Sequence, residues 1–321
     1  MKNFMKTAVV VILMSGSLAA CGSDTGQDGG NKSISLLPGV AADTAYISME
    51  CAAKETAKKL GYKIDVQAPQ KFDATLQRPI VDAAIANRPA AMIIAPTDTS
   101  ALQKSLEKAK ADGIKVVLFD TTTEDPSVAV SSVATDNPGV GAAGFEAIAK
   151  AHPKGGKVWV IGSAPGISTG DERLKGFEDA AAKNSAFEYV GVQYGGDDAA
   201  KAAQLTAAAL QKDPDIVGIF GVSYKEAQGS VTAVKQAGLS DKITMVAVDS
   251  DPGQVKALEA GDFSALVAQD FETIGVKSVE QAVAAIEGKP VKKKIETGVH
   301  VITPDNLSTP ESQAAIYKSS C

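Results

Sequence analysis

Several polar side chains in this 321-residue sequence stand directly after short apolar runs. They include Asp120 after the run 114–119, Asp249 after the run 244–248 and Gln269 after the run 265–268. A carboxylate accepts hydrogen bonds with the added strength of a charged acceptor, and an amide both donates and accepts them. Groups of this kind are suited to binding a polar solute.

Catalytic and metal-binding patterns are missing from the sequence. The chain has only two histidines, His152 and His300, and neither stands beside a nucleophile or at metal-ligand spacing. No glycine-rich phosphate loop follows the first apolar run. We therefore expect no enzymatic activity, no metal and no cofactor.

The apolar runs alternate with alanine- and lysine-rich segments that have helical periodicity. In the segment 43–60, Tyr46, Met49, Ala53 and Ala57 form one apolar stripe. The apolar runs are mostly continuous, as in parallel strands buried on both faces. They are 34–37, 62–66, 91–95, 114–119, 158–161, 189–192, 216–220, 244–248 and 265–268. Repeated units of this length predict an α/β protein with doubly wound parallel sheets.

This series of strands and helices is interrupted once. Four strand–helix units precede Asp136-Asn137-Pro138, and a second series begins at Val158. Two similar lobes side by side would form a cleft. Ligands of open α/β sheets gather beyond the carboxyl ends of the strands, so the polar residues that follow the strands are the candidates for ligand contact.

The first 32 residues have the order of an export signal. Lys2 and Lys6 precede an apolar run too short to span a bilayer. Leu18-Ala19-Ala20-Cys21 resembles a lipobox, which predicts a signal peptide over 1–20 and a lipid on Cys21; an ordinary cleaved signal is the alternative. Residues 21–32 are polar and glycine-rich, as in a flexible tether. We expect a protein anchored by diacylation to the outer face of the cell membrane.

Charge and cysteine content narrow the class further. The net charge is −6, and the only concentrated basic stretch is Lys292-Lys293-Lys294, so nucleic acid is not an expected partner. Cys51 and Cys321 remain after the anchor. In an oxidising compartment such a pair tends to form a disulfide, which we expect here; two free thiols are the alternative.

Taken in order, the landmarks of this chain are similar to those of one family. They are Lys59-Leu60-Gly61-Tyr62, Ala95-Pro96-Thr97-Asp98, Phe119-Asp120, Ala134-Thr135-Asp136-Asn137, Glu172-Arg173-Leu174-Lys175-Gly176-Phe177, Val248-Asp249 and Ala268-Gln269. The sequence resembles the type I periplasmic binding proteins, in particular the ribose-binding-protein-like group. The lac-repressor family shares this body but begins with a helix-turn-helix, which is not found here.

The resemblance implies two Rossmann-like lobes joined by three crossover strands, with hinges near Asn137, Gln269 and His300. It places residues 33–136 and 270–299 in the N-terminal lobe. Residues 137–269 and 300–321 would form the C-terminal lobe and a tail. It also implies a receptor, expected to be monomeric, that closes around a small solute and is recognised by an ABC permease.

Four matched positions are expected to contact the ligand. Asp120 matches the family aspartate that accepts hydrogen bonds from sugar hydroxyls, although a helix-capping role is the alternative. Arg173 matches the arginine of the opposite lobe, where its planar donors can fork onto hydroxyl oxygens; a surface arginine on a helix is the alternative. Asp249 and Gln269 match two further binding positions, and either could instead only brace the hinge.

Other matched positions depart from the family pattern. Asp43 stands at the family's asparagine position and could simply cap its helix. Tyr46 stands at that of a stacking ring and could simply belong to the core. Asp197 and Ser223 replace a phenylalanine and an asparagine, while the neighbouring Tyr224 could supply aromatic surface. Thr121 replaces an arginine.

These departures predict a cleft with less aromatic area and more carboxylate than the family pattern. Only 5% of the residues are aromatic. We expect a neutral, slim ligand rich in hydroxyl groups, such as a small sugar or a linear polyol. The alternatives are an enzyme on the same sheets, a sensor coupled to a kinase or chemoreceptor, and a receptor for a cationic or signalling molecule.

Overall fold

The computed structural model describes residues 31–321. The predicted signal peptide, the predicted lipidation site Cys21 and almost all of the predicted tether lie outside these residues. Within the part that is described, no helix is long and apolar enough to cross a membrane.

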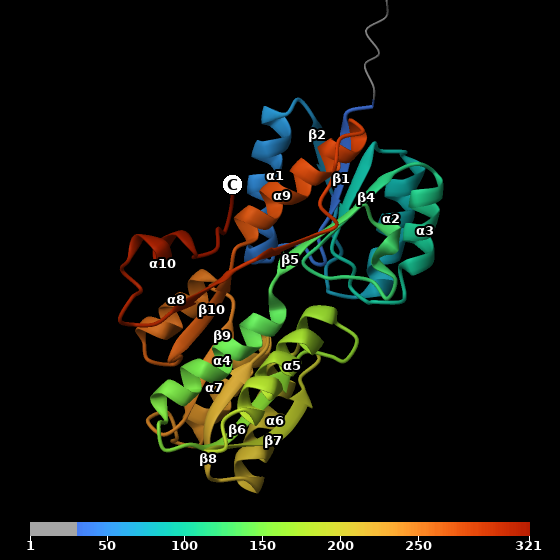
Figure 1. The fold of residues 1–321 in the computed structure, drawn as a ribbon. Helices are drawn as coiled ribbons and strands as arrows, with labels where there is room; N and C mark the ends of the chain where they lie inside the picture. Colours follow the sequence, from blue (N-terminus) through green and yellow to red (C-terminus); the bar gives the residue numbers. More distant parts are fainter. Residues whose placement is uncertain (1–30) are drawn as a thin grey trace, which may run out of the picture. The chain divides into compact units, whose positions relative to one another are not determined.

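The first of two six-stranded sheets contains the N-terminal strands (Figure 1). Its strand order is β11-β5-β4-β3-β1-β2, and every pairing in it is parallel. The strands are β1 (Ser33–Leu37), β2 (Lys63–Val66), β3 (Ala91–Ile94), β4 (Lys115–Phe119), β5 (Ser131–Thr135) and β11 (Lys294–Thr297). The central β3 is buried along its whole length, as its continuous apolar run predicted.

The second sheet repeats this order with later strands, as β12-β10-β9-β8-β6-β7. Only β12 runs antiparallel to its neighbour, β10. The strands are β6 (Gly156–Gly162), β7 (Phe187–Tyr194), β8 (Ile216–Gly221), β9 (Thr244–Val248), β10 (Ala265–Gln269) and β12 (Val299–Ile302). Each sheet with its helices forms one lobe, and the predicted α/β fold class is confirmed.

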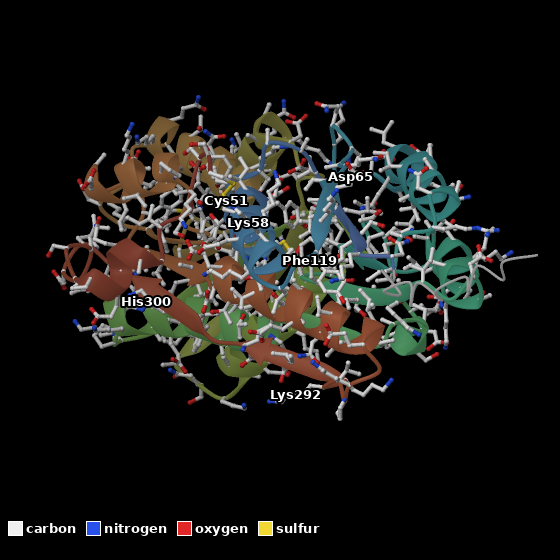
Figure 2. The ribbon with its side chains drawn as sticks, turned by 90° about the horizontal axis from the view of Figure 1, so that it is seen from above. Cys51, Lys58, Asp65, Phe119, Lys292 and His300 are labelled. Atoms are coloured by element: carbon white, nitrogen blue, oxygen red, sulfur yellow. A yellow bond between two sulfur atoms is a disulfide. The ribbon has the colours of Figure 1, made fainter. Side chains whose placement is uncertain are left out.

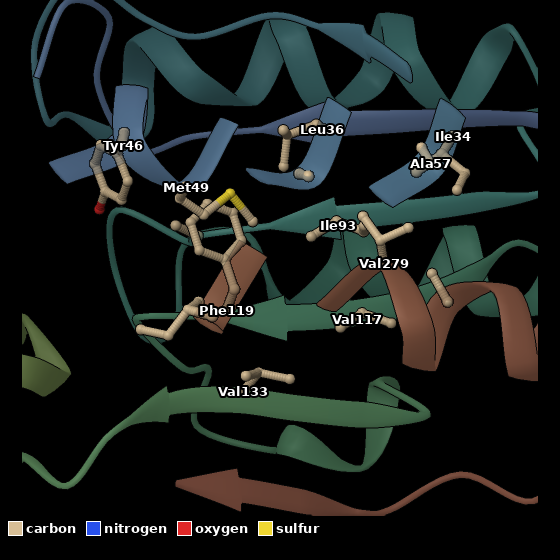
Figure 3. Close-up of a cluster of buried hydrophobic side chains, with 14 of the residues drawn as sticks. Ile34, Leu36, Tyr46, Met49, Ala57, Ile93, Val117, Phe119, Val133 and Val279 are labelled. Carbon is tan, nitrogen blue, oxygen red and sulfur yellow. The ribbon is translucent and has the colours of Figure 1, made fainter. Parts of the chain in front are cut away.

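The helices cover the sheets with their apolar faces. They are α1 (Thr44–Lys59), α2 (Ala74–Ala86), α3 (Gln103–Ala111), α4 (Asn137–Ala151), α5 (Ser168–Ala182), α6 (Ala199–Lys212), α7 (Tyr224–Gln236), α8 (Pro252–Glu259), α9 (Phe271–Ile286) and α10 (Pro310–Ala314). Figure 3 shows Met49 of α1 and Val279 of α9 facing Phe119 and Val117 of β4 in one buried cluster. This cluster holds α1, which begins at the cleft, against the sheet.

The chain passes between the two sheets three times. It leaves β5 of the first sheet for α4, leaves β10 of the second sheet for α9, and passes from β11 to β12. Asn137 and Gln269 stand at the first two passages, and Gly298 separates the two strands of the third. The contacts of side chains at these passages depend on how the two sheets are placed relative to each other.

After β12 the last residues return to the first helix. The structure has a disulfide between Cys51 of α1 and Cys321, across 270 residues of sequence (Figure 2). It ties the C-terminus to the helix whose first turn lies at the candidate site.

Candidate functional site

A cleft of about 220 Å³ lies between the carboxyl ends of strands from both sheets. Nine of the ten residues predicted to contact a ligand line it: Asp43, Tyr46, Asp120, Arg173, Asp197, Ser223, Tyr224, Asp249 and Gln269. The tenth, Thr121, does not. Nine residues chosen from the sequence therefore line one cleft, and the contacts within it define what each side chain can do.

Asp120 lies at the base of the wall formed by the N-terminal lobe. It follows β4 with a left-handed backbone (φ 58°) and is 8% exposed. The hydroxyl of Tyr46 donates to its Oδ2 at 2.7 Å. Burial raises the pKa of Asp120 to about 6, against the lowering effects of the nearby Arg173 charge and of the Tyr46 hydrogen bond. The carboxylate is a strong acceptor whose ionisation costs free energy until a donor approaches.

Tyr46 is held as a fixed wall of the cleft. Its ring meets Phe119 and Phe271 edge-on, at centroid distances of 5.8 and 5.9 Å. Burial and the charge of Asp120 raise its pKa well above the ordinary value, so the hydroxyl keeps its proton and donates. The ring is therefore both core and cleft surface, two roles that the sequence analysis treated as alternatives.

Asp43 caps α1 and still faces the cleft. Its Oδ1 accepts from the backbone N–H groups of Ala45 (2.8 Å) and Tyr46 (3.3 Å). Its Oδ2 has no hydrogen-bond partner within residues 31–321 and is open to a ligand. Burial and the charge of Asp249 raise the pKa of Asp43 to about 6. Asp43 is exposed at the cleft surface, whereas Asp120 is buried, so the pH dependence of folding is expected mainly from Asp120.

Arg173 comes from α5 in the other lobe and is 5% exposed. Its Nε donates to Asn137 Oδ1, Nη1 to the Val222 carbonyl and Nη2 to Gln269 Oε1, each at 2.9 Å. Three of its five N–H groups are therefore used, and two remain for a ligand. The guanidinium is part of the framework of the cleft as well as a candidate ligand contact.

Gln269 joins the passages between the two sheets. Its Oε1 accepts from Thr135 Oγ1 at 2.8 Å and from Arg173, while its Nε2 donates to Asp249 Oδ1 at 2.7 Å. Thr135 ends β5 of the first sheet, whereas Gln269 ends β10 of the second. Gln269 thus braces the hinge and also lines the cleft.

A buried glutamate that the sequence analysis missed organises the C-terminal wall. Glu226 of α7 is fully buried, and its Oε1 accepts from the Asp197 backbone N–H at 2.8 Å. The hydroxyl of Ser223 donates to its Oε2, and Ser163 donates to Ser223 at 3.1 Å. Burial raises the pKa of Glu226. One carboxylate therefore positions two loops that line the cleft.

Two predictions about the cleft surface need correction. Thr121 is 2% exposed and donates to the Pro96 carbonyl at 2.7 Å, so its hydroxyl serves the loop and not the cleft. The aromatic surface is also larger than predicted, because Phe72 and Phe271 line the cleft beside Tyr46 and Tyr224.

A further cation also changes the expected charge balance. Lys225 lines the cleft and forms an ion pair with Asp197 at 2.6 Å. Both side chains are about half exposed, so the pair contributes little stability. It does neutralise one of the four carboxylates of the cleft.

Two hydrogen bonds cross from one lobe to the other at the edges of the cleft. Thr44 Oγ1 of α1 donates to Asp251 Oδ2, the N-cap of α8, at 3.0 Å. The Thr122 backbone N–H donates to Ser168 Oγ of α5 at 3.0 Å. None of these four residues lines the cleft, so the two hydrogen bonds can stabilise a closed form without contact between these residues and a ligand.

Some of the missed residues carried a readable signal. Ser163 follows a predicted strand closely, so the rule used for Asp120 applied to it as well. Ser223-x-x-Glu226 has the spacing of a helix capping box, yet the glutamate reaches a different loop. Phe72 and Phe271 carried no local signal, because only the tertiary fold brings them to the cleft.

Comparison with known proteins agrees with this geometry. A family model described as "Periplasmic binding protein domain" matches residues 34–290. The ribose import binding protein of Bacillus subtilis (strain 168) is 30% identical over 93% of this chain and 99% of its own length. The D-allose-binding periplasmic protein of Escherichia coli (strain K12) is 29% identical over 75% of this chain and 80% of its own.

Solved structures are similar over the whole body of the protein. An ABC transporter solute-binding protein of Agrobacterium vitis, bound with α-D-tagatopyranose, has a TM-score of 0.86 and 34% identity and covers 89% of this chain and 99% of its own. A carbohydrate transporter solute-binding protein of Agrobacterium radiobacter, in complex with D-arabinose, has a TM-score of 0.84 and 27% identity, with coverage of 90% and 99%. The chain therefore belongs to the type I periplasmic binding proteins of the ribose-binding type.

Proposed function

We propose that this protein is the extracytoplasmic receptor of an ABC importer, and that it binds a small neutral sugar or sugar alcohol. Relatives in the family import ribose or bind allose, and similar structures hold tagatose or arabinose. These are transport-associated binding proteins, not enzymes. The observation that carries the proposal is the convergence of Asp43, Asp120 and Asp249 with Arg173 on one cleft between two lobes.

The charge of the cleft supports a neutral ligand. Four carboxylates line it against two cations, Arg173 and Lys225. Lys225 is paired with Asp197, and Arg173 gives three N–H groups to the protein itself. A phosphate or carboxylate would meet repulsion there, whereas hydroxyl groups can donate to the carboxylates.

The size of the cleft supports a single small molecule. Its volume of about 220 Å³ is below the range of about 300–1,000 Å³ typical of sites for drug-sized ligands. The rings of Tyr46, Phe72, Tyr224 and Phe271 add apolar surface on which the C–H face of a monosaccharide can pack. This aromatic area admits cyclic sugars as well as the linear polyols that the sequence favoured.

The mechanism that we propose is hinge closure, and it needs no chemical step. A ligand bound between the lobes favours the closed form only through contacts that are better in that form. The hydrogen bonds Thr44–Asp251 and Thr122–Ser168 support such a form, because each needs both lobes close together. The closed surface would then be recognised by the membrane permease.

Membrane attachment is a separate part of the proposal. The lipobox-like Leu18-Ala19-Ala20-Cys21 supports cleavage before Cys21 and diacylation of its thiol, and two acyl chains suffice for stable anchoring. We expect a monomer tethered to the outer face of the membrane. Replacing Cys21 with alanine should release the protein from the membrane fraction, and a variant that stays attached would refute the anchor.

A thermal-shift screen of the protein without its predicted signal peptide and tether (residues 33–321) tests the proposed ligand class. The panel contains D-ribose, D-allose, D-arabinose, D-fucose, D-tagatose, D-glucose and the pentitols. A ligand at 100 times its dissociation constant adds about 2.7 kcal/mol of stability, which shifts the melting temperature visibly. The same ligand should give a much smaller shift in Asp120→Asn. A panel without any stabilising member, or conversion of a sugar to a new product, would overturn the proposal.

A further inference from the structure

The C-terminal tail is bonded to both lobes. On the C-terminal lobe, the Tyr317 N–H donates to the Ser250 carbonyl at 3.1 Å, and Ser250 Oγ donates to the Ala315 carbonyl at 2.5 Å. On α1 of the other lobe, Ser48 Oγ accepts from the Lys318 N–H at 2.7 Å. The disulfide of Cys321 with Cys51 lies one turn further along α1. The tail therefore changes lobes between Tyr317 and Lys318.

Tyr317 fills the hinge at this point and is 5% exposed. Its ring meets Phe271 edge-on, at 5.6 Å and 83°, and the other edge-on contact of Phe271 is with Tyr46. Tyr317 lines a separate cavity of about 460 Å³ behind the hinge and does not line the ligand cleft. It is placed to act on the cleft through its neighbours and not by direct contact.

The hydroxyl of Tyr317 has two partners, and both belong to the candidate site. It accepts from the Gln269 backbone N–H at 3.0 Å and donates to Asp249 Oδ1 at 3.1 Å. Burial and the charge of Asp249 raise the Tyr317 pKa well above its ordinary value, so the proton stays on the phenol. Together with the side-chain amide of Gln269, the phenol gives Oδ1 of Asp249 two donors. No hydrogen bond reaches Oδ2 of Asp249 within residues 31–321, so this oxygen is available to a ligand.

We propose that Tyr317 is a positioning residue for ligand binding, and that the Cys51–Cys321 disulfide keeps it in place by fixing the tail to α1. This proposal rests on the proposed function, because it takes Asp249 and Gln269 as ligand contacts. The Tyr317 hydroxyl holds the Asp249 carboxylate and the end of β10 in one orientation. Without the disulfide, three contacts among residues 31–321 remain between the tail and the N-terminal lobe: the hydrogen bond of Lys318 to Ser48, its ion pair with Glu272, and the packing of the Tyr317 ring against Phe271.

Tyr317→Phe tests the first half of the proposal, since it keeps the ring and removes only the hydroxyl. Tyr62→Phe is the matched control, because Tyr62 is also buried but its hydroxyl donates to Glu287 at 3.5 Å, and neither residue lines the cleft. Amide hydrogen exchange, which needs no ligand, should become faster in residues 265–271 of Tyr317→Phe and should stay unchanged there in Tyr62→Phe. Unchanged exchange in that segment would refute the role of the hydroxyl even if no sugar of the panel bound.

Calorimetry tests whether Tyr317 acts on ligand binding through Asp249. It uses the sugar that gives the largest thermal shift. Tyr317→Phe should weaken binding about five- to tenfold, within the usual range for the loss of one hydrogen bond. In an Asp249→Ala background, which removes the acceptor of the Tyr317 hydroxyl, the same change should cost less than twofold. An equal loss in both backgrounds would show that Tyr317 acts by general stabilisation and would overturn the positioning role.

The disulfide is tested with the double variant Cys51→Ser/Cys321→Ser, which leaves no unpaired thiol in residues 31–321. Exchange in residues 315–320 should become faster, and sugar affinity should fall about threefold. Wild-type protein treated with a reductant should behave in the same way, whereas the double variant should not respond to the reductant. A protected tail with unchanged affinity in the double variant would contradict the proposed function of the disulfide.

Discussion

The two lobes place an aspartate at the same point of the same framework. Asp120 follows β4 and Asp249 follows β9, and these strands occupy equivalent positions in the two sheet orders. Both residues have a left-handed backbone, with φ of 58° and 79°. Both donate their backbone N–H to the next strand, to the carbonyls of Val133 and Val267. Asp tolerates this conformation better than most residues, so one backbone solution serves both walls of the cleft.

The side chains then serve different purposes. Asp120 is bonded to Tyr46, which is locked in the core of its own lobe. Asp249 is bonded to Gln269 and Tyr317, which belong to the hinge and the tail. The N-terminal wall is therefore a fixed acceptor surface, whereas the C-terminal wall is bonded to the hinge and the tail, which move in the proposed closure. In the proposed mechanism, the N-terminal lobe therefore recognises the ligand, and the C-terminal lobe couples that recognition to closure.

The largest expected effect distinguishes the two aspartates directly. Asp120→Asn should weaken sugar binding by about 3 kcal/mol, because a desolvated charged acceptor is lost. Asp249→Asn should cost at least about 1 kcal/mol less, since the amide oxygen can still accept from Gln269 and Tyr317. Calorimetry on both variants measures the difference. If Asp249→Asn were the more damaging change, recognition would lie on the hinge side.

The next effect concerns the guanidinium that joins the C-terminal wall to the hinge. Arg173→Lys should weaken binding by about 2 kcal/mol and also lower the free energy of unfolding, because an ammonium cannot reach Asn137, Val222 and Gln269 in one plane. Lys225→Ala, at the exposed ion pair, is the control and should change stability by less than about 1 kcal/mol. Denaturant unfolding that left Arg173→Lys as stable as wild type would contradict this framework role.

The raised pKa of Asp120 predicts opposite pH trends for stability and affinity. The folded value of about 6 exceeds the ordinary value of 3.8, so the unliganded folded state binds more protons between these pH values. Its unfolding free energy should therefore fall as pH rises from about 4 to about 6, by about 3 kcal/mol. Ligand hydroxyls need the ionised form, so affinity should drop about tenfold from pH 7 to pH 5.

Asp120→Asn provides the control for both trends. The polar groups around the Asp120 carboxyl all remain in this variant; they belong to Tyr46, Asp43, Asp249, Arg173 and Glu172. Its stability should vary less with pH over the same interval. Wild-type affinity that rose on acidification would mean that the ligand prefers the protonated carboxyl.

The smallest expected effect comes from a contact that touches no ligand. Thr44→Val removes the hydrogen bond to Asp251 across the cleft while keeping the shape of the side chain. Apparent affinity should fall by about 0.5–1 kcal/mol, since the closed form loses one hydrogen bond. Small-angle scattering of the unliganded variant should show no more closed protein than wild type. Unchanged affinity would indicate that this bond does not contribute to closure.

Much of the fold and part of the site could be predicted from sequence. Buried parallel strands have continuous apolar runs, so β3, β4 and β9 were recognisable, and Asp120 and Asp249 followed from their positions after strands. The strand β5, with the sequence SSVAT, was missed because small polar residues alternate in it with the apolar ones. Its assignment depends on pairing with β4 and β11, which no local pattern reveals.

The rest of the site depends on long-range structure. Glu226 and Tyr317 act on the cleft from a helix and from a tail, and their partners lie 29 and 68 residues away in sequence. Thr121 shows the converse, because a residue next to Asp120 turns its hydroxyl to a loop carbonyl instead. Sequence position after a strand predicts nearness to the cleft, but side-chain direction is decided by the backbone conformation of each loop.

We propose above all that the cleft selects a neutral polyhydroxylated ligand. It is tested most directly by calorimetry with matched pairs: D-ribose with D-ribose 5-phosphate, D-arabinose with D-arabinose 5-phosphate, and D-tagatose with D-tagatose 6-phosphate. At least one neutral sugar should bind, and its phosphate should not compete at millimolar concentration, because four carboxylates line the cleft. A phosphate that bound more tightly than its parent sugar would contradict it.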